Sequence, residues 1–170
     1  LVHRVWFMMM WRSMTAADLP AIKQVADVVH RDFPESDTVF EERLRLYAAG
    51  CFVLIDGERI SGYVISHPWL YRQPPALNSL LQAIPHAADT YYIHDIALLD
   101  EARRSGSASG IVRIIVEHAR DRSFSNLSLI AVNGSSPFWL RHGFSVVSDP
   151  GIDLKLKSYG DGAKFMTLRF

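Results

Sequence analysis

A short polar segment from Arg103 to Ala108 carries the residues best suited to hold a phosphate group. It contains two arginines, one glycine and three other small residues. Arginine offers a planar fork of donors to phosphate, and small residues let an anion approach the main chain. If a helix follows, its first N–H groups are free and its dipole places partial positive charge there. The pattern therefore predicts a phosphate cradle.

Regular patterns flank this segment on both sides. The stretch from Tyr91 to Leu99 is rich in aromatic and branched apolar residues, which is typical of a buried strand. After the segment, apolar residues recur at helical spacing at Ile111, Ile115 and Ala119, with charged residues between them. The order of strand, polar loop and helix places the cradle at the start of the helix.

Two motifs together resemble the GCN5-related N-acetyltransferase (GNAT) family. Arg103-x-x-Gly106-x-Ala108 is similar to the family's coenzyme A pyrophosphate loop, which has Gln or Arg, then Gly, then Gly or Ala at these positions. The segment 133–144 is similar to its second signature, an Asn, an aromatic pair and Gly-Phe. The resemblance implies that acetyl-CoA is the co-substrate. It implies coenzyme contacts at Ile96, Ala97, Leu98, Arg103, Arg104, Ser105, Gly106, Ser107, Ala108, Ser109, Asn133, Phe138 and Trp139.

His94 is the first candidate for the base that acetyl transfer needs, because an amine must be neutral to attack a thioester. Free histidine has a pKa of ~6.5 and accepts a proton near neutrality, directly or through water. His94 lies nine residues before Arg103. At this offset the serotonin N-acetyltransferase branch of the family carries a histidine that serves as base. A hydrogen-bonded core histidine and a residue that orients the substrate are the other two interpretations.

Asp95 is the second candidate catalytic residue. Alternation along a strand places His94 on one face and Asp95 on the other. Asp95 therefore shares the pocket of His94 only if a bulge intervenes, and the family has such a bulge nearby. The alternative is a structural role, in which Asp95 holds a backbone or arginine group.

Trp139 stands where many members of the family have a tyrosine that protonates the leaving thiolate. An indole N–H donates hydrogen bonds but is not a useful acid. The thiolate then leaves unaided, or Tyr159, Ser136 or water assists it. Phe138 and Trp139 also fit ordinary core aromatics, and Asn133 fits a helix cap as well as a coenzyme contact.

Apolar periodicity and turn residues predict the other elements. One helix is expected from about Leu19 to before Pro34 with Asp18 as its cap, and another over 40–48 with a Thr38-x-x-Glu41 capping box. A short helix is expected over 135–142 and a loop over 149–162. Strands are expected at 5–12, 51–55, 60–66, 127–132, 144–147 and 164–170, with Asp56-Gly57 as a hairpin turn. The result is an α/β (α+β) fold with a mixed, mostly antiparallel central sheet flanked by helices.

Residues 67–89 break these patterns. Four prolines interrupt the segment, and Leu77, Leu80 and Leu81 hint at one short helix. Long irregular insertions in a domain are usually functional or mobile. We expect a flap over the acceptor pocket, with a plain surface loop as the alternative.

Composition limits the class of protein. The 170 residues, about half of them apolar, suit one domain over 1–170, with residues 1–10 as an over-extended or artificial start. Lys+Arg and Asp+Glu balance at 18 each, so no nucleic-acid partner is indicated. No apolar run can span a bilayer and no metal-ligand cluster is evident, so neither a membrane nor a metal is expected.

The single cysteine, Cys51, excludes an internal disulfide and fits a reducing, cytoplasmic location. Its place in a strand-like run fits a buried apolar role better than a reactive one.

These features favour a transferase that moves an acetyl group from acetyl-CoA to the primary amine of a small molecule. The acidic joint Arg31–Asp37 and the aromatic residues around His94 favour a cationic, aromatic amine. Acetylation of a protein N-terminus or lysine is the alternative among enzymes. A non-catalytic coenzyme A binding or sensing domain and an unrelated phosphate-binding module are the others, and a homodimer is left open.

Overall fold

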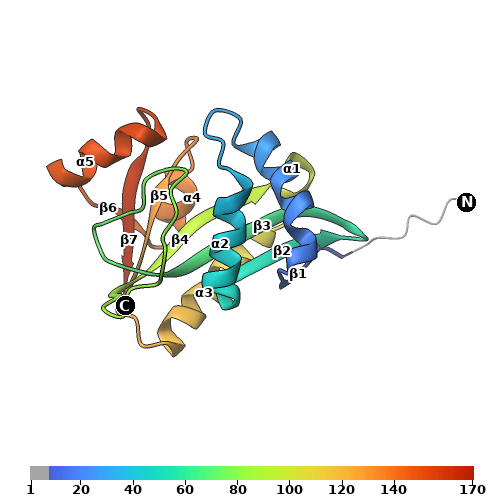
Figure 1. Cartoon of the computed structure of the whole chain (residues 1–170), viewed down its shortest axis with the longest axis horizontal. Coiled ribbons are helices and arrows are strands. Elements are labelled where there is room, and N and C mark those ends of the chain that lie inside the picture. The colour runs from blue at the N-terminus through green and yellow to red at the C-terminus, as the bar shows by residue number, and fades with distance from the viewer. Residues whose placement is uncertain (1–7) are drawn as a thin grey trace, which may run out of the picture.

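The computed structural model describes residues 8–170, and seven strands within that range form one sheet (Figure 1). The strands are β1 Met10–Ser13, β2 Cys51–Asp56, β3 Arg59–Trp69, β4 Thr90–Leu98, β5 Asn126–Ala131, β6 Ser145–Val146 and β7 Lys164–Arg169. The helices are α1 Leu19–Val29, α2 Asp37–Leu46, α3 Ser107–Asp121, α4 Ser136–Arg141 and α5 Pro150–Leu156. Four short 3-10 turns are η1 Ala16–Asp18, η2 Ala48–Gly50, η3 Asp100–Ala102 and η4 Lys157–Tyr159.

The strand order is β1-β2-β3-β4-β5-β7-β6, and β4 and β5 are the one parallel pair of neighbours in the described residues. The predicted mixed, mostly antiparallel sheet is therefore confirmed. In the β3–β4 ladder, Ile65 lies opposite Asp95 but Ser66 lies opposite Ile93. His94 is the extra residue of a β-bulge at this point.

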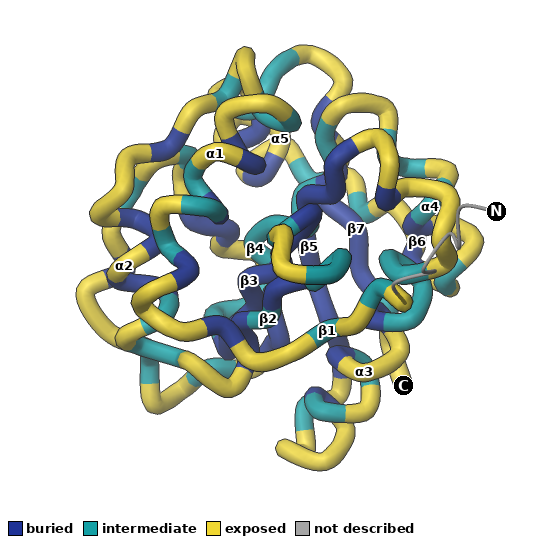
Figure 2. The backbone as a smooth tube through the Cα atoms, turned by 90° about the vertical axis from the view of Figure 1, so that its right-hand side faces the viewer, coloured by how far each residue is buried: buried dark blue, intermediate teal, exposed yellow. Residues whose placement is uncertain are grey.

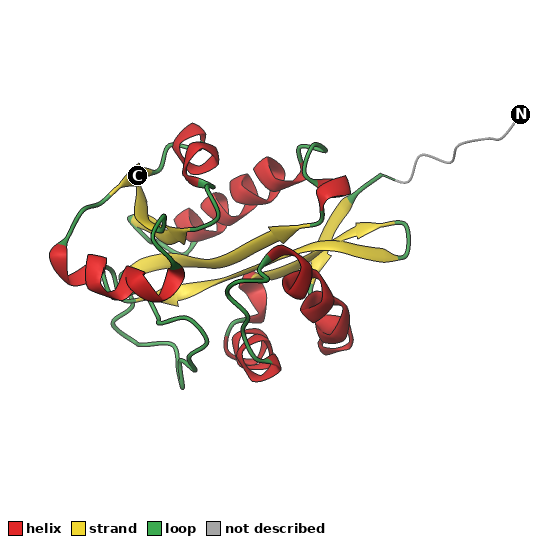
Figure 3. Ribbon diagram, turned by 90° about the horizontal axis from the view of Figure 1, so that it is seen from above, coloured by secondary structure: helices red, strands yellow, loops and turns green. Residues whose placement is uncertain are grey.

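Helices cover both faces of the sheet (Figure 3). Residues of α1 and α2 pack with Cys51, Val53, Tyr63, Ile65 and Ala97 on one face. Residues of α3 and α4 pack on the other face, in a cluster that includes Val64, Tyr91, Ile93, Leu127 and Leu129. The buried positions accordingly run along the central strands, while the outer sides of the helices are exposed (Figure 2).

Two predicted helix caps are wrong. The helix α1 begins at Leu19 as expected, but the Asp18 side chain makes no capping bond. Its carboxylate instead accepts from both terminal nitrogens of Arg12, at 2.7 and 2.8 Å, and from the Thr15 N–H at 2.8 Å. The helix α2 follows Ser36, so Thr38 lies inside its first turn and cannot form the expected capping box.

Four other predictions also need correction. The expected loop 149–162 contains α5 and η4, because the Asp149 carboxylate accepts from the N–H groups of Gly151 and Ile152 at 2.8 and 3.2 Å and Pro150 takes the first helical position. The expected short helix in 67–89 is absent from that segment, and β3 extends to Trp69 instead. The hairpin loop is Gly57 and Glu58 rather than 56–57, and Gly57 has φ 66°. The expected strand 5–12 is observed only as β1, and residues 1–7 lie outside the described range.

Candidate functional site

A cavity opens where β4 and β5 separate. The two strands pair only from Tyr91 to Ile93 opposite 127–129, although β4 continues to Leu98 and β5 to Ala131. The space beyond the last pair has a volume of about 380 Å³. Nine of the predicted site residues line it: His94, Asp95, Ile96, Leu98, Arg103, Ala108, Asn133, Phe138 and Trp139.

The remaining predicted residues lie around this cavity rather than on its wall. Ala97 is buried on the α1/α2 face of the sheet, as alternation from Ile96 requires. Arg104, Ser105, Gly106, Ser107 and Ser109 form the loop before α3 and its first turn, next to Arg103 and Ala108. The cavity therefore reaches the loop that the sequence predicts as a phosphate cradle.

The loop before α3 has the backbone that an anion site needs. Gly106 has φ 78°, a left-handed conformation that favours glycine. The Ser105 hydroxyl donates to the Ala102 carbonyl at 2.7 Å and shapes the turn. The helix α3 is 15 residues long, and at its start the Ser107 N–H donates to the Ser105 hydroxyl at 3.2 Å. No other side chain of the described residues accepts from the N–H groups of the first turn, so the next N–H groups are available to an acceptor from outside the chain.

The bulge in β4 brings His94 and Asp95 to the same face of the sheet. Without it, alternation would turn the two side chains in opposite directions. With His94 as the extra residue, both reach groups on the α1/α2 side: His94 meets Glu35 in the joint between α1 and α2, and Asp95 meets His30 at the end of α1.

His94 and Glu35 form a buried pair. The His94 Nε2 lies 2.8 Å from a Glu35 carboxylate oxygen, and the two side chains are 2% and 8% exposed. An ionised carboxylate only accepts, so Nε2 carries the proton of this bond. The other Glu35 oxygen accepts from the Asn78 N–H at 3.0 Å. The His94 Nδ1 is buried and has no partner in the described residues, so it is the nitrogen left to accept a proton.

Asp95 forms a second pair with His30. The His30 Nε2 lies 2.7 Å from one Asp95 oxygen, and the Tyr63 hydroxyl donates to the other. Asp95 thus holds a histidine and a tyrosine, rather than the backbone or arginine group named among its structural alternatives. On the far side of the ring, the His30 Nδ1 lies 3.3 Å from the side-chain nitrogen of Asn133.

Each carboxylate stays ionised because of its histidine. Burial raises the pKa of Glu35, but the charge and hydrogen bond of His94 outweigh burial and hold that pKa below its usual value. The same balance, with His30 as partner, lowers the pKa of Asp95, whose side chain is 14% exposed. In return, the negative charge of Asp95 raises the pKa of His30 despite partial burial.

Three segments close the cavity on the side of α1. Phe33, Leu77 and Tyr159 line it from the α1–α2 joint, the loop 70–89 and η4. The Tyr159 hydroxyl donates to the Pro75 carbonyl at 2.7 Å. Gly160 lies against the Phe33 ring, since a Cβ there would be 2.9 Å from its Cζ. These contacts join η4 to both the joint and the loop.

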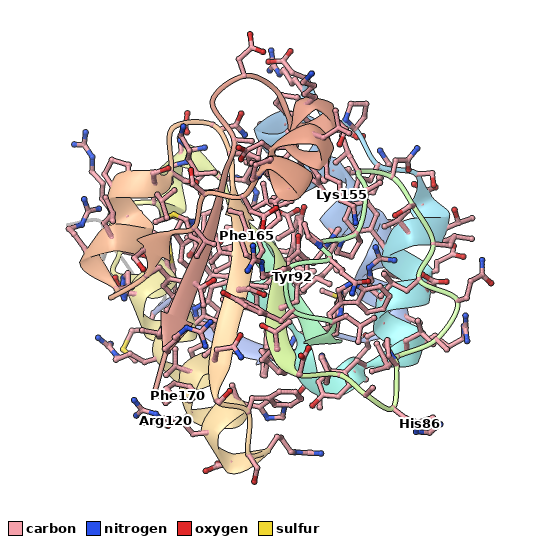
Figure 4. The ribbon with its side chains drawn as sticks, turned by 90° about the vertical axis from the view of Figure 1, so that its left-hand side faces the viewer. His86, Tyr92, Arg120, Lys155, Phe165 and Phe170 are labelled. Carbon is pink, nitrogen blue, oxygen red and sulfur yellow. The ribbon has the colours of Figure 1, made fainter. Side chains whose placement is uncertain are left out.

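The loop 70–89 is anchored from α2. The buried Glu42 carboxylate accepts from the N–H groups of Leu81 and Gln82 at 2.6 and 3.0 Å, and Arg43 donates to it at 2.8 Å. Away from these anchors the loop runs along the outside of the molecule, with His86 at its outer bend and Tyr92 in the interior (Figure 4).

Sequence reasoning missed two of the side chains that build this site. No sequence pattern marks His30, and Glu35 stands out only as part of the acidic joint Arg31–Asp37. Their partners are 65 and 59 residues away along the chain. Spacing within one element carries no signal for such pairs, and the bulge that brings them together depends on strand register.

Three further expectations concern metal ligands, membrane-spanning helices and the single cysteine. Within residues 8–170, no three His, Cys, Asp or Glu side chains are grouped so as to hold a metal ion. In that same range, no helix combines the length and apolar character that a bilayer crossing requires. Cys51 is a buried free thiol, and burial raises its pKa to about 12, which disfavours the reactive thiolate.

Solved structures with the same fold have very different sequences. The loading GNATL domain of CurA from Lyngbya majuscula superimposes with a TM-score of 0.79 at 11% identity, covering 95% of this chain and 98% of that one. A GphF GNAT-like decarboxylase in complex with isobutyryl-CoA gives 0.78 at 14%, covering 94% and 98%. Rv2747 from Mycobacterium tuberculosis in complex with coenzyme A gives 0.70 at 19%, covering 95% and 99%. At such identities the likeness establishes the fold and not the reaction.

A family model gives the assignment that the fold alone does not. No curated protein sequence matches the chain. The model of the acetyltransferase (GNAT) family matches residues 11–144, which include the bulge, the loop before α3 and the Gly-Phe that follows α4. This match supports an acyl-CoA-dependent N-acyltransferase. The chain belongs to the acetyltransferase (GNAT) family.

Proposed function

We propose that this protein transfers an acetyl group from acetyl-CoA to the primary amine of a small molecule. The observation that carries the proposal is the cavity between β4 and β5, which reaches the N-terminus of α3. An extended molecule with a pyrophosphate at one end and a thioester at the other fits such a site. The pyrophosphate binds at Arg103 to Ser109, and the thioester lies between the separated strands.

The free edge of β4 holds the arm that carries the acetyl group. Past Ile93 this edge has no strand partner on the β5 side, so main-chain groups of residues 96–98 are available to a ligand, apart from the Leu98 carbonyl, which accepts from Arg103 Nε at 3.2 Å. A backbone N–H here stabilises the carbonyl oxygen as it becomes negative. Ile96 and Leu98 supply an apolar wall, and Phe138 and Trp139 face them from α4.

His94 is the base, and Glu35 sets its orientation. Because the Nε2 proton is held by Glu35, the Nδ1 lone pair accepts the proton from the attacking amine. Since His94 is only 2% exposed, a water molecule or the bound amine itself must reach that nitrogen from within the cavity. Glu35 then stabilises the imidazolium that forms, as the third member of a catalytic triad does.

The closed side of the cavity favours a small acceptor. A polypeptide would need an open groove beside the thioester. Phe33, Gly160, Tyr159 and Pro75 bridge that side by contacts between three segments. Two carboxylates, the buried Glu35 and the partly buried Asp95, lie at this end and favour a cationic amine, although each is already paired with a histidine.

Two alternatives lead to different outcomes in one experiment. The protein is incubated with acetyl-CoA carrying a labelled acetyl group and with two acceptor sets, small primary amines and peptides with a free N-terminus or lysine. We expect the label in at least one small amine. Greater transfer to peptides would overturn the acceptor class. No transfer to either set, with coenzyme A bound, would favour a non-catalytic binding domain.

A further inference from the structure

His30 lies at the end of a helix, but its side chain is mostly buried against the cavity. It follows the last residue of α1, its side chain is 14% exposed, and it lines the cavity. Asp95 on β4 holds its Nε2 at 2.7 Å, and Asn133 in the turn after β5 lies 3.3 Å from its Nδ1. The ring thus lies between β4 and the turn that follows β5, next to the space assigned to the thioester.

The surroundings of His30 favour its protonated form. Asp95 faces it from β4 and Glu35 from the α1–α2 joint, and both negative charges raise its pKa. Arg103 from the loop before α3 acts in the opposite sense, as does partial burial. His94 and Tyr159 also line this cavity. The C-terminal end of α1 adds a favourable dipole for a cation.

The contact with Asn133 accommodates either charge state. Side-chain amides present an oxygen and a nitrogen in nearly the same shape, and which one faces a histidine is assigned from the hydrogen-bond network. The amide nitrogen donates to a neutral Nδ1, and the amide oxygen accepts from a protonated one. His30 can therefore gain and lose its Nδ1 proton without leaving its place.

Other described side chains on the cavity wall are poor proton donors to sulfur. Trp139 carries an indole, which is not a useful acid, and Arg103 is permanently charged. The Tyr159 proton is already given to the Pro75 carbonyl, and burial raises the pKa of this phenol further. His94 is engaged with Glu35 and is assigned to the amine.

We propose that His30 is a second catalytic residue, the acid that protonates the sulfur of coenzyme A as the thioester bond breaks. The inference rests on the proposed acetyl transfer. The amine nitrogen bonds to the carbonyl carbon and gives up a proton to His94. The carbon–sulfur bond then breaks, its electron pair stays on sulfur, and the Nδ1 proton of His30 moves there. The products are the N-acetyl amine and the coenzyme A thiol, and each histidine then exchanges one proton with solvent.

The test compares pH profiles of kcat for the wild type and His30→Gln, with the exposed His86→Gln as matched control. A reaction that needs a protonated His30 loses rate as pH rises through the pKa of that group. His30→Gln is expected to lower kcat by about 10²-fold, to lose this alkaline limb and to keep the acidic limb. The KM for acetyl-CoA should stay within about threefold, since the interaction acts in the transition state. His86→Gln should match the wild type.

Asp95→Asn provides the second variant, since Asp95 acts here as a positioning residue. Loss of its charge lowers the pKa of His30, so the alkaline limb should move to lower pH rather than vanish. Nuclear magnetic resonance of the His30 imidazole, in the full protein with coenzyme A bound, should show the same shift without any turnover. Circular dichroism and coenzyme A affinity check that both variants fold.

Two results would overturn the assignment. One is an unchanged rate and alkaline limb in His30→Gln, in a preparation whose wild type transfers acetyl groups. The other is a His30 imidazole that titrates at or below the ordinary histidine pKa of ~6.5 in the wild type. A wild type that binds coenzyme A but transfers nothing would be a different failure, that of the proposed function itself.

Discussion

At the scale of single residues, one inserted residue in a strand determines what the site contains. The bulge at His94 turns two consecutive side chains toward α1 and α2. Each then forms a carboxylate–histidine pair, with Glu35 for His94 and with His30 for Asp95. Neither carboxylate is free to bind substrate alone. Each carboxylate and its histidine therefore act together in this site.

The first prediction concerns the role of Glu35. Glu35→Gln keeps a hydrogen-bonding group near the His94 Nε2 but removes the charge that stabilises an imidazolium. We expect kcat to fall by about 10²-fold, with little change in the KM for acetyl-CoA. Steady-state kinetics at fixed pH measure both constants.

A matched control for Glu35 lies in the β2–β3 hairpin. Glu58 is exposed there, and Glu58→Gln makes the same chemical change away from the cavity. It should leave kcat unchanged. Equal losses in both variants, or no loss in Glu35→Gln, would contradict the role given to Glu35.

At the scale of elements, the loop before α3 carries a prediction about coenzyme binding. Gly106 has φ 78°, and nothing lies within 4 Å of a Cβ added there, so a substitution meets backbone strain and not a clash. Gly106→Val should distort the loop and weaken coenzyme A binding by about tenfold, given a strain of roughly 1–3 kcal/mol. Isothermal titration calorimetry gives the dissociation constant directly.

Gly162→Ala is the control for this loop. Gly162 is exposed, has open space around its Cβ position and lacks a left-handed φ. Its coenzyme A affinity should equal that of the wild type. Unchanged affinity in Gly106→Val would mean that the phosphate group binds elsewhere.

The anchoring of the loop 70–89 gives a prediction about stability. Both oxygens of Glu42 accept hydrogen bonds, from Arg43 and from the N–H groups of Leu81 and Gln82. Glu42→Gln removes the charge that pairs with buried Arg43 and turns an NH₂ group toward N–H donors. Breaking a buried pair costs roughly 3–5 kcal/mol, and urea denaturation measures the loss.

The neighbouring Glu41 supplies the comparison for Glu42. It is exposed on the same helix, and Glu41→Gln should change the free energy of unfolding by no more than about 0.5 kcal/mol. Limited proteolysis should also cut 70–89 faster in Glu42→Gln than in Glu41→Gln. Equal stability and equal cleavage would show that Glu42 does not hold the loop.

At the scale of the whole molecule, a buried histidine makes folding sensitive to acid. His67 is 1% exposed, and its Nδ1 donates to the Pro68 carbonyl at 2.9 Å. Burial lowers its pKa to about 3. In the unfolded chain a histidine titrates near ~6.5, so the unfolded state binds the proton first. Stability from this group is present above pH 6.5 and is lost as pH falls toward 3.

His67→Asn tests this linkage, because its amide can still donate to the Pro68 carbonyl without titrating. Between pH 7.5 and pH 5 the wild type should lose about 2 kcal/mol more than the variant. Urea denaturation at the two pH values gives both differences, so a lower absolute stability of the variant does not affect the comparison. Parallel losses in the two proteins would contradict the assignment to His67.

Local signals in the sequence predicted most of the sheet and helix order, and the corrections have physical causes. Helix α1 and the strand and helix around Gly106 follow from periodicity. The cap predicted at Asp18 is wrong because its carboxylate binds Arg12, and the cap predicted at Thr38 is wrong because α2 already begins at Asp37. The helix α5 was missed because an Asp-Pro-Gly sequence suggests a turn as readily as a helix start.

In the candidate site, too, local motifs could be predicted from the sequence and long-range contacts could not. The residues of β4, the loop before α3 and α4 that line the cavity belong to compact motifs, so they could be named from the sequence. His30 and Glu35 could not, because their roles arise from contacts between elements far apart in the chain. The sequence shows only that Asp95 can share the pocket of His94 if a bulge intervenes. Whether the bulge forms depends on strand register.

The most direct test of the account measures thiol release from acetyl-CoA with a panel of small primary amines between pH 6 and pH 9, for the wild type and His94→Gln. The account predicts saturable release with at least one amine, matched by formation of the N-acetyl product. It also predicts a fall in kcat of about 10²-fold or more in the variant, with coenzyme A binding retained. Wild-type protein that binds coenzyme A and releases no thiol with any amine, or a variant as fast as the wild type, would contradict it.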